Sequence, residues 1–186
     1  MTNSLFPVTS LELFCKRFSR WNYLLDGGAE KAAMRALQLL KDINRKVPPA
    51  VLAAWMHTAL NGWCTARRFQ SQGKCRLSQT CHGEDSLEHY SKCRFAWVCA
   101  QNRLRLSGAP RSFSRFLGLQ GKSIEETTLL VVQQAAVYHA VNHVRTRNVR
   151  GSEGEAACLI EAKIRALGTQ CRPLGNLLRD IWRRTT

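Results

Sequence analysis

One stretch rich in cysteine and histidine constrains the fold of this chain more than any other feature. Over 19 residues it has the spacing Cys-x5-Cys-x7-His-x3-Cys, formed by Cys75, Cys81, His89 and Cys93. Thiolates and histidine rings are the ligands that Zn²⁺ prefers, and four of them close a tetrahedral structural site. The spacing therefore predicts that these four residues bind one Zn²⁺ ion, which would fix the intervening loop.

The second half of the stretch is predicted to be helical, with Asp85 or Ser86 as the N-cap. On such a helix His89 and Cys93 are four residues apart, so they share one face. The loop that carries the other two ligands then has to fold back onto this face. Gly83 lies between the two halves, where its permissive backbone suits a tight reversal.

The spacing of the first two ligands leaves alternatives open. Five residues separate Cys75 from Cys81, whereas two to four are usual in a zinc knuckle. His82 is therefore an alternative to Cys81 as the second ligand. The stretch also has an explanation without a metal, in which the cysteines are ordinary buried residues and His89 is a partly exposed side chain.

The chain is strongly basic. Its 186 residues include 28 Lys and Arg against 13 Asp and Glu, a formal net charge of +15. The excess is concentrated around the Cys/His stretch and at the C-terminus, and a surface of this kind attracts polyanions, above all nucleic acid. We therefore expect RNA or DNA as a partner, with an anionic membrane surface as the alternative.

Two adjacent arginines lie between two aromatic residues just before the Cys/His stretch, in the segment 63–69. This arrangement suits phosphate contact combined with base stacking. The alternative places the two arginines of the segment on a solvent face, with Trp63 and Phe69 in the core. The basic residues expected to contact nucleic acid flank the predicted ligands and are Arg67, Arg68, Lys74, Arg76, Lys92 and Arg94.

Apolar residues recur at helical spacing along most of the chain, and no segment shows the sustained alternation of a strand. We expect an all-α fold, an irregular helical bundle with an inserted small zinc-knuckle-like loop. The segment 124–147 is the most apolar and is predicted to be the central helix. The other helices are predicted over 9–24, 29–46, from Pro49 through Trp63, from 86 to 105, over 112–118 and 153–167, and in a short segment ending at 182–184. Three regions are expected: an N-terminal helical region (1–62), the Cys/His segment with its flanking helix (63–105) and a C-terminal helical region (106–186).

Several functional classes lack support in the sequence. No run of eighteen apolar residues indicates a transmembrane helix, and the N-terminus lacks the features of a secretory signal. We therefore expect an intracellular protein, nuclear or cytoplasmic, with reduced cysteines. Asp occurs only four times, and the carboxylate clusters that polymerases and nucleases use to hold metal ions are missing. The sequence therefore predicts no enzymatic activity.

A known family has a similar order of residues. The order here is the segment 63–69, a pair of cysteines, the segment 83–88 (Gly-Glu-Asp-Ser-Leu-Glu), then a histidine and a cysteine. It resembles the zinc-binding segment of non-LTR (LINE-like) retrotransposon reverse transcriptases, which lies C-terminal to the polymerase. The resemblance covers about 60–145 and implies that the zinc ligands are Cys75, Cys81, His89 and Cys93.

The resemblance also implies a function. In that family the C-terminal module holds template RNA or target DNA during reverse transcription, and this chain, which lacks the polymerase, would contribute the holding and not the synthesis. Its partners would be nucleic acid and the polymerase part of the same element. Two alternatives remain: a helical protein-interaction module stapled by zinc, and a nonfunctional fragment of a mobile element.

Overall fold

The structure, a computed structural model, describes residues 8–106, 111–147 and 150–184. Within these ranges the chain is helical and contains one isolated antiparallel bridge, between Lys74 and Glu84, and no sheet. The predicted all-α class is therefore confirmed. The α-helices are α1 (Val8–Phe18), α2 (Gly28–Ile43), α3 (Pro49–Ala59), α4 (Leu87–Tyr90), α5 (Arg94–Asn102), α6 (Phe113–Phe116), α7 (Ile124–Thr146), α8 (Glu153–Gln170) and α9 (Arg172–Arg183), with 3₁₀ turns η1 (Ser19–Leu24) and η2 (Arg67–Phe69).

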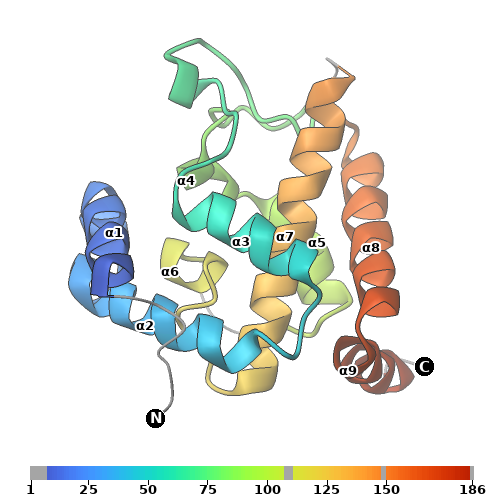
Figure 1. The fold of residues 1–186 in the computed structure, drawn as a ribbon. Helices are drawn as coiled ribbons and strands as arrows, with labels where there is room; N and C mark the ends of the chain where they lie inside the picture. The colour runs from blue at the N-terminus through green and yellow to red at the C-terminus, as the bar shows by residue number, and fades with distance from the viewer. Residues whose placement is uncertain (1–7, 107–110, 148–149, 185–186) are drawn as a thin grey trace.

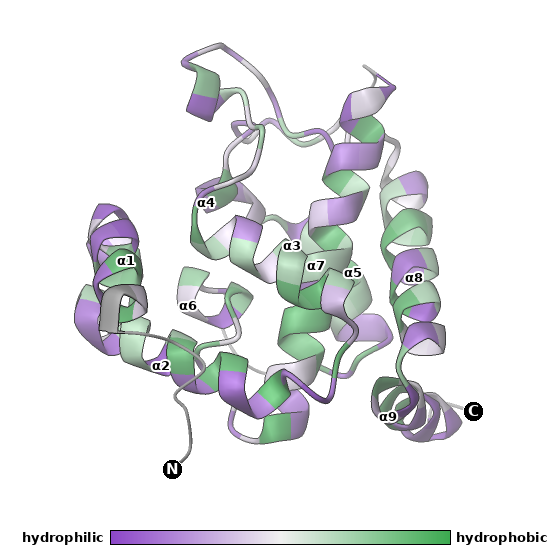
Figure 2. Ribbon diagram, in the orientation of Figure 1, coloured by the Kyte–Doolittle hydropathy of each residue, from purple (hydrophilic) through white to green (hydrophobic). Residues whose placement is uncertain are grey.

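Helix α7 forms the centre of the bundle, as the sequence predicts (Figure 1). It contacts α2, α3, α5, α6 and α8, and its residues are buried on all sides over most of its length. A helix that is covered all round needs its polar side chains paired. The buried amide of Gln133 donates to the Ala96 carbonyl, and that of Gln134 donates to the Thr58 hydroxyl. Figure 2 shows hydrophobic and polar residues interspersed along this helix.

Helix α3 is shorter than predicted. It ends at Ala59, and Asn61 adopts a left-handed conformation with φ of 57°. Trp63 therefore lies beyond the helix, but it is fully buried, and its indole nitrogen donates to the Thr58 hydroxyl at 2.7 Å. The prediction that this helix extends to Trp63 is wrong. Apolar character indicates that a residue is buried, but a buried ring can lie after a turn as well as within a helix.

The helix predicted from 86 to 105 is broken in two. Helix α4 is a single turn capped by the Ser86 side chain, and α5 begins after Cys93, whose ψ of 125° is extended. Side chains bind the backbone carbonyls that the break leaves free of helical hydrogen bonds. The Ser91 hydroxyl donates to the Glu88 carbonyl at 2.8 Å, and the Trp97 indole donates to the Ser91 carbonyl at 2.8 Å. Such bonds compete with a continuous helical ladder. His89 and Cys93 therefore do not share one helical face.

Helices α8 and α9 cover the side of α7 opposite α1 and α2 (Figure 1). Helix α8 packs along α7 and α5, and α9 packs against α8 at its C-terminal end. None of the described helices is long and apolar enough to span a lipid bilayer.

Candidate metal centre

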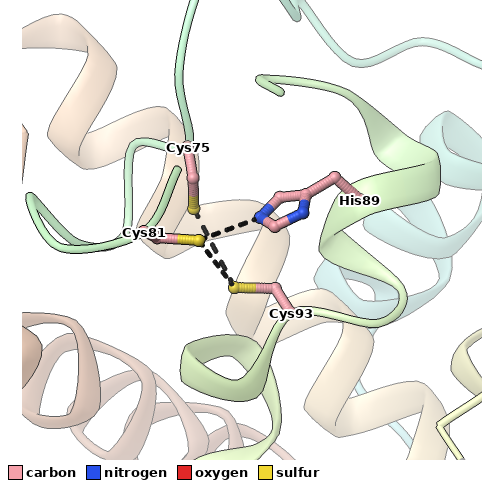
Figure 3. A group of neighbouring side chains, drawn as sticks. All are labelled: Cys75, Cys81, His89 and Cys93. Carbon is pink, nitrogen blue, oxygen red and sulfur yellow. Dashed lines mark hydrogen bonds between the residues drawn. The ribbon is translucent and has the colours of Figure 1, made fainter. Parts of the chain in front are cut away.

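Four side chains from three parts of the chain point toward one another (Figure 3). They are the predicted ligands Cys75, Cys81, His89 and Cys93, and their potential ligand atoms all lie within 4.8 Å of one another. Cys75 and Cys93 are buried, and the other two are half-buried. The exposed His82 is not part of this group, so the structure brings Cys81 and not His82 to the cluster.

Three distances within the cluster are close to those expected for tetrahedral coordination. The Cys93 sulphur lies 3.9 Å from that of Cys75 and 4.0 Å from that of Cys81, and the His89 Nε2 lies 3.3 Å from the Cys81 sulphur. Ligands at the corners of a tetrahedron with metal–sulphur bonds of about 2.3 Å and metal–nitrogen bonds of about 2.0 Å stand about 3.8 Å and about 3.5 Å apart. A disulfide needs sulphurs about 2.05 Å apart, and the eight cysteines are free thiols. The cluster is therefore compatible with a metal site.

A short hairpin carries the first two ligands. The isolated bridge between Lys74 and Glu84 closes it, and the Cys75 amide donates to the Gly83 carbonyl at 2.8 Å. Cys81 stands near the tip of this hairpin, while His89 comes from the single turn of α4 and Cys93 from the start of α5. The wide Cys-x5-Cys spacing is thus accommodated by a hairpin rather than by a tight knuckle turn.

Gly83 leaves space for the His89 ring. A Cβ atom built at Gly83 would stand 2.0 Å from Cε1 and 2.1 Å from Nδ1 of that ring. Its φ is not in the left-handed region, so conformational freedom is not what requires glycine here. The prediction that glycine is needed between the two halves has a different physical reason, which is the close approach of a ligand.

The two buried cysteines of the cluster, Cys75 and Cys93, have pKa values shifted in opposite directions. The side-chain hydrogen bond from the Cys75 thiol, opposed by burial and assisted by His89, lowers the pKa of Cys93 to about 4. The same hydrogen bond and burial raise the pKa of Cys75. The lowered pKa of Cys93 favours its thiolate, the form in which cysteine binds metals.

Asp85 anchors the cluster to the rest of the fold. Its carboxylate is 1% exposed and accepts from the Tyr90 hydroxyl at 2.7 Å, the Ala66 amide at 3.0 Å, and the Arg145 guanidinium at 2.9 and 3.0 Å. Burial first, and then the charge of Asp85, raise the pKa of Tyr90, so its hydroxyl stays protonated and donates. Of the two N-cap candidates, Ser86 caps α4 and Asp85 takes this other role.

Arg150 holds the hairpin from outside. Its guanidinium donates to the carbonyls of Cys75 at 3.0 Å, Ser78 at 2.7 Å and Cys81 at 2.7 Å. The next residue, Gly151, exchanges backbone hydrogen bonds with Arg76 and Gln79. The segment between α7 and α8 therefore fixes the backbone that presents two of the four ligands. The sequence gives no signal for this contact, since Arg150 is one of many arginines.

Two of the basic residues predicted to contact nucleic acid are engaged with carboxylates. Arg67 forms an ion pair with Glu84 at 3.0 Å. Arg76 lies 3.8 Å from Asp85, and only 26% of its side chain is exposed. These two arginines are less able to meet a phosphate than their positions in the sequence indicate.

The other four predicted residues are exposed around the cluster. The Arg94 guanidinium lies over the Phe95 ring, 4.5 Å from its centroid, which restrains the side chain while leaving the residue exposed. The three remaining exposed residues lie on both sides of the hairpin and are Arg68, Lys74 and Lys92.

The two aromatic residues of segment 63–69 have opposite environments. Trp63 is in the core, whereas Phe69 is 64% exposed on the 3₁₀ turn η2, which projects from the bundle (Figure 1). The alternative with both rings in the core therefore holds for Trp63 and is wrong for Phe69, whereas base stacking stays a prediction. An exposed phenylalanine beside two arginines is available for stacking.

Another histidine pair, His139 and His143, does not form a metal group. Both lie on α7, but neither belongs to a cluster of three or more potential ligands in the described part of the chain. Burial first, and then the charge of Lys163, lower the pKa of His139, so this ring is neutral and packed between α7 and α8.

Comparison with known proteins gives no relative from which a role could be transferred. No family model matches the chain, and neither a curated protein nor a solved structure matches it at a significant level.

Proposed function

We propose that the chain is a non-catalytic, zinc-binding module that contacts nucleic acid. The observation that carries the zinc part is the mutual distance of the four ligand atoms, all within 4.8 Å. Three cysteines and one histidine form one of the common ligand sets of structural zinc, and hard cations such as Mg²⁺ prefer oxygen ligands. With all four positions occupied by protein, such a site stabilises structure and leaves no open position for catalysis.

The nucleic-acid part of the proposal is supported by charge. The net charge is +15, and exposed basic residues flank the cluster on both sides, beside the exposed ring of Phe69. This combination suits phosphate contact and base stacking. The resemblance to the zinc-binding segment of non-LTR retrotransposon reverse transcriptases gives the proposal its specific form, a module that holds template RNA or target DNA for a polymerase.

Metal analysis tests the zinc site. The purified full-length chain should contain about one Zn²⁺ per molecule, and the double variant H89A/C93A should lose it, because two remaining ligands bind zinc weakly. The matched control is C158A, which removes an exposed thiol outside the cluster. Full zinc content in H89A/C93A would refute the ligand assignment.

Salt dependence tests the nucleic-acid contact. Binding to labelled single-stranded and duplex probes should weaken steeply between about 50 and 200 mM salt, since phosphate contacts release counterions. Affinity that does not change over this range would rule out phosphate contact as the basis of binding.

A protein-interaction module is the second candidate, in which the exposed basic residues around the cluster bind an acidic protein. The ion pairs of Arg67 and Arg76 with Glu84 and Asp85 reduce the number of cations available to either partner. A stoichiometric protein complex that survives nuclease treatment would favour this second candidate.

A further inference from the structure

A groove between α8 and α9 carries a charge that the metal centre does not explain. It has a volume of about 410 Å³ and is lined by three arginines, Arg165, Arg172 and Arg179, together with Trp182, Leu178 and small residues. Among the described residues that line it there is no carboxylate. It lies at the C-terminal end of α8, whereas the Cys/His cluster lies at the other end of this helix (Figure 1).

The spacing of residues along the two helices builds this groove. Arg165 and Gly168 are three residues apart on α8, so they share a face of that helix. Arg172 begins α9 after the extended Cys171 and lines the groove from the second helix. Gly168 and Gly175 form the contact between the helices, where a Cβ at Gly175 would stand 2.7 Å from the Gly168 carbonyl oxygen. The glycines let the helices approach closely and keep side chains out of the floor of the groove.

The arginines of the groove are only partly neutralised. Arg165 is paired with Glu161 at 2.8 Å, and Glu161 also pairs with Arg103. Arg172 is exposed at the first position of α9, a helix with no acidic residue in its first turn. A cation at the positive end of a helix dipole is unfavourable, so an anion bound there would be stabilised by both the guanidinium and the dipole.

An aromatic ring completes the groove. The Arg165 guanidinium lies over the Trp182 ring, 4.8 Å from its centroid. Arg179 contacts the Asn176 amide oxygen, which restrains its guanidinium at the rim. Planar guanidinium groups bind phosphate in a bidentate manner, and tryptophan and arginine planes both stack on nucleobases.

We propose that this groove binds one nucleotide unit of a single-stranded nucleic acid, with its phosphates on Arg172 and Arg179 and its base against the plane of Trp182 and Arg165. This inference rests on the proposed function and adds to it a second contact, remote from the Cys/His cluster. Stacking on an open base requires an unpaired strand, so the groove favours single strands over duplex.

The double variant R172Q/R179Q tests the groove in the full-length zinc-loaded chain. Its affinity for a labelled single-stranded oligonucleotide should fall at least tenfold, and the slope of log affinity against log salt should become shallower by about 1.4, since each lost contact contributes about 0.7 on single strands. The control is K31Q/R35Q on α2, which removes the same charge from exposed positions across the molecule. A single-stranded probe carrying 5-iodouracil should also photo-crosslink to the peptide 172–183.

The possible results separate this proposal from the proposed function. If R172Q/R179Q binds as tightly as K31Q/R35Q, or crosslinks map only to 63–105, the groove is not the contact, although the zinc module stands. If the unmodified chain binds no single-stranded or duplex probe, the nucleic-acid function itself fails and the groove proposal fails with it. A specific loss in R172Q/R179Q with unchanged zinc content supports the groove.

Discussion

At the scale of single residues, the geometry of the cluster depends on groups that are not ligands. Gly83 allows the His89 ring to reach the three sulphurs, because any side chain at this position would occupy the volume of the ring. Arg150 and Asp85 act on the backbone and on the helix ends that carry the ligands. The four ligands supply the chemistry, while these three residues supply the positions.

The substitution G83A should lower zinc affinity at least tenfold. The added methyl would stand about 2 Å from the His89 ring, so the ring has to rotate away from the sulphurs. Competition with a chromophoric chelator measures this. The control is G154A on α8, where an added Cβ meets no atom within 4 Å; an equal loss in both variants would contradict the role of the contact.

The sequence predicts which side chains form the cluster because spacing and residue type are local properties. The order of Cys75, Cys81, His89 and Cys93 indicates a group, and the four side chains meet in the structure. The roles of Asp85 and Arg150 could not be predicted, since each depends on a partner at least sixty residues away. At turns, the hydrophobic pattern is a poor predictor of which aromatic rings are buried. Phe69 and Trp63 lie in one such segment, and Phe69 is exposed while Trp63 is buried.

At the scale of elements, the helices follow the sequence closely and their connections do not. The apolar periodicity of α2, α7 and α8 gives their positions to within a few residues. The sequence does not predict the break between α4 and α5, because no proline or glycine marks it. Side-chain hydrogen bonds from Ser91 and Trp97 accompany the end of the first helix instead. Because of this break, Cys93 lies in an extended backbone before α5 and points toward the hairpin. In a continuous helix its side chain would have a different direction.

Arg150, which lies between α7 and α8, supports the hairpin of the Cys/His cluster. The substitution R150Q removes three charge-assisted hydrogen bonds to the hairpin carbonyls, and loss of groups that orient metal ligands typically costs about 10- to 100-fold in metal affinity. We expect a loss in this range by chelator competition. The control R147Q alters an exposed arginine of the same segment that lies 3.8 Å from Glu155 and should bind zinc normally.

At the scale of the whole molecule, one continuous core joins the helices from α1 to α9. The core includes Cys75 and Cys93, but most of its residues lie on α2, α3, α5, α7 and α8. A chain of this length buries enough apolar surface to fold without help from a metal. The predicted division into regions 1–62, 63–105 and 106–186 stays a prediction, and the contacts of Asp85 and Arg150 cross its boundaries.

Removal of zinc should therefore leave the bundle folded. After chelation we expect most of the helical circular dichroism signal to persist, while amide hydrogen exchange becomes fast in residues 73–93 and stays slow in α7. The reason is that the ligands hold the hairpin, and the packing of α7 does not depend on them. Loss of the helical signal on chelation would show that the metal supports the whole fold.

The contact of Arg150 with the hairpin also has a kinetic consequence. It joins residues separated by 75 positions in the chain, and contacts of this separation close a long loop and form late in folding. On the ribosome the four ligands emerge well before Arg150. We therefore expect the hairpin to reach its final form only after Arg150 has been synthesised, and the thiols of the cluster to be less protected until then.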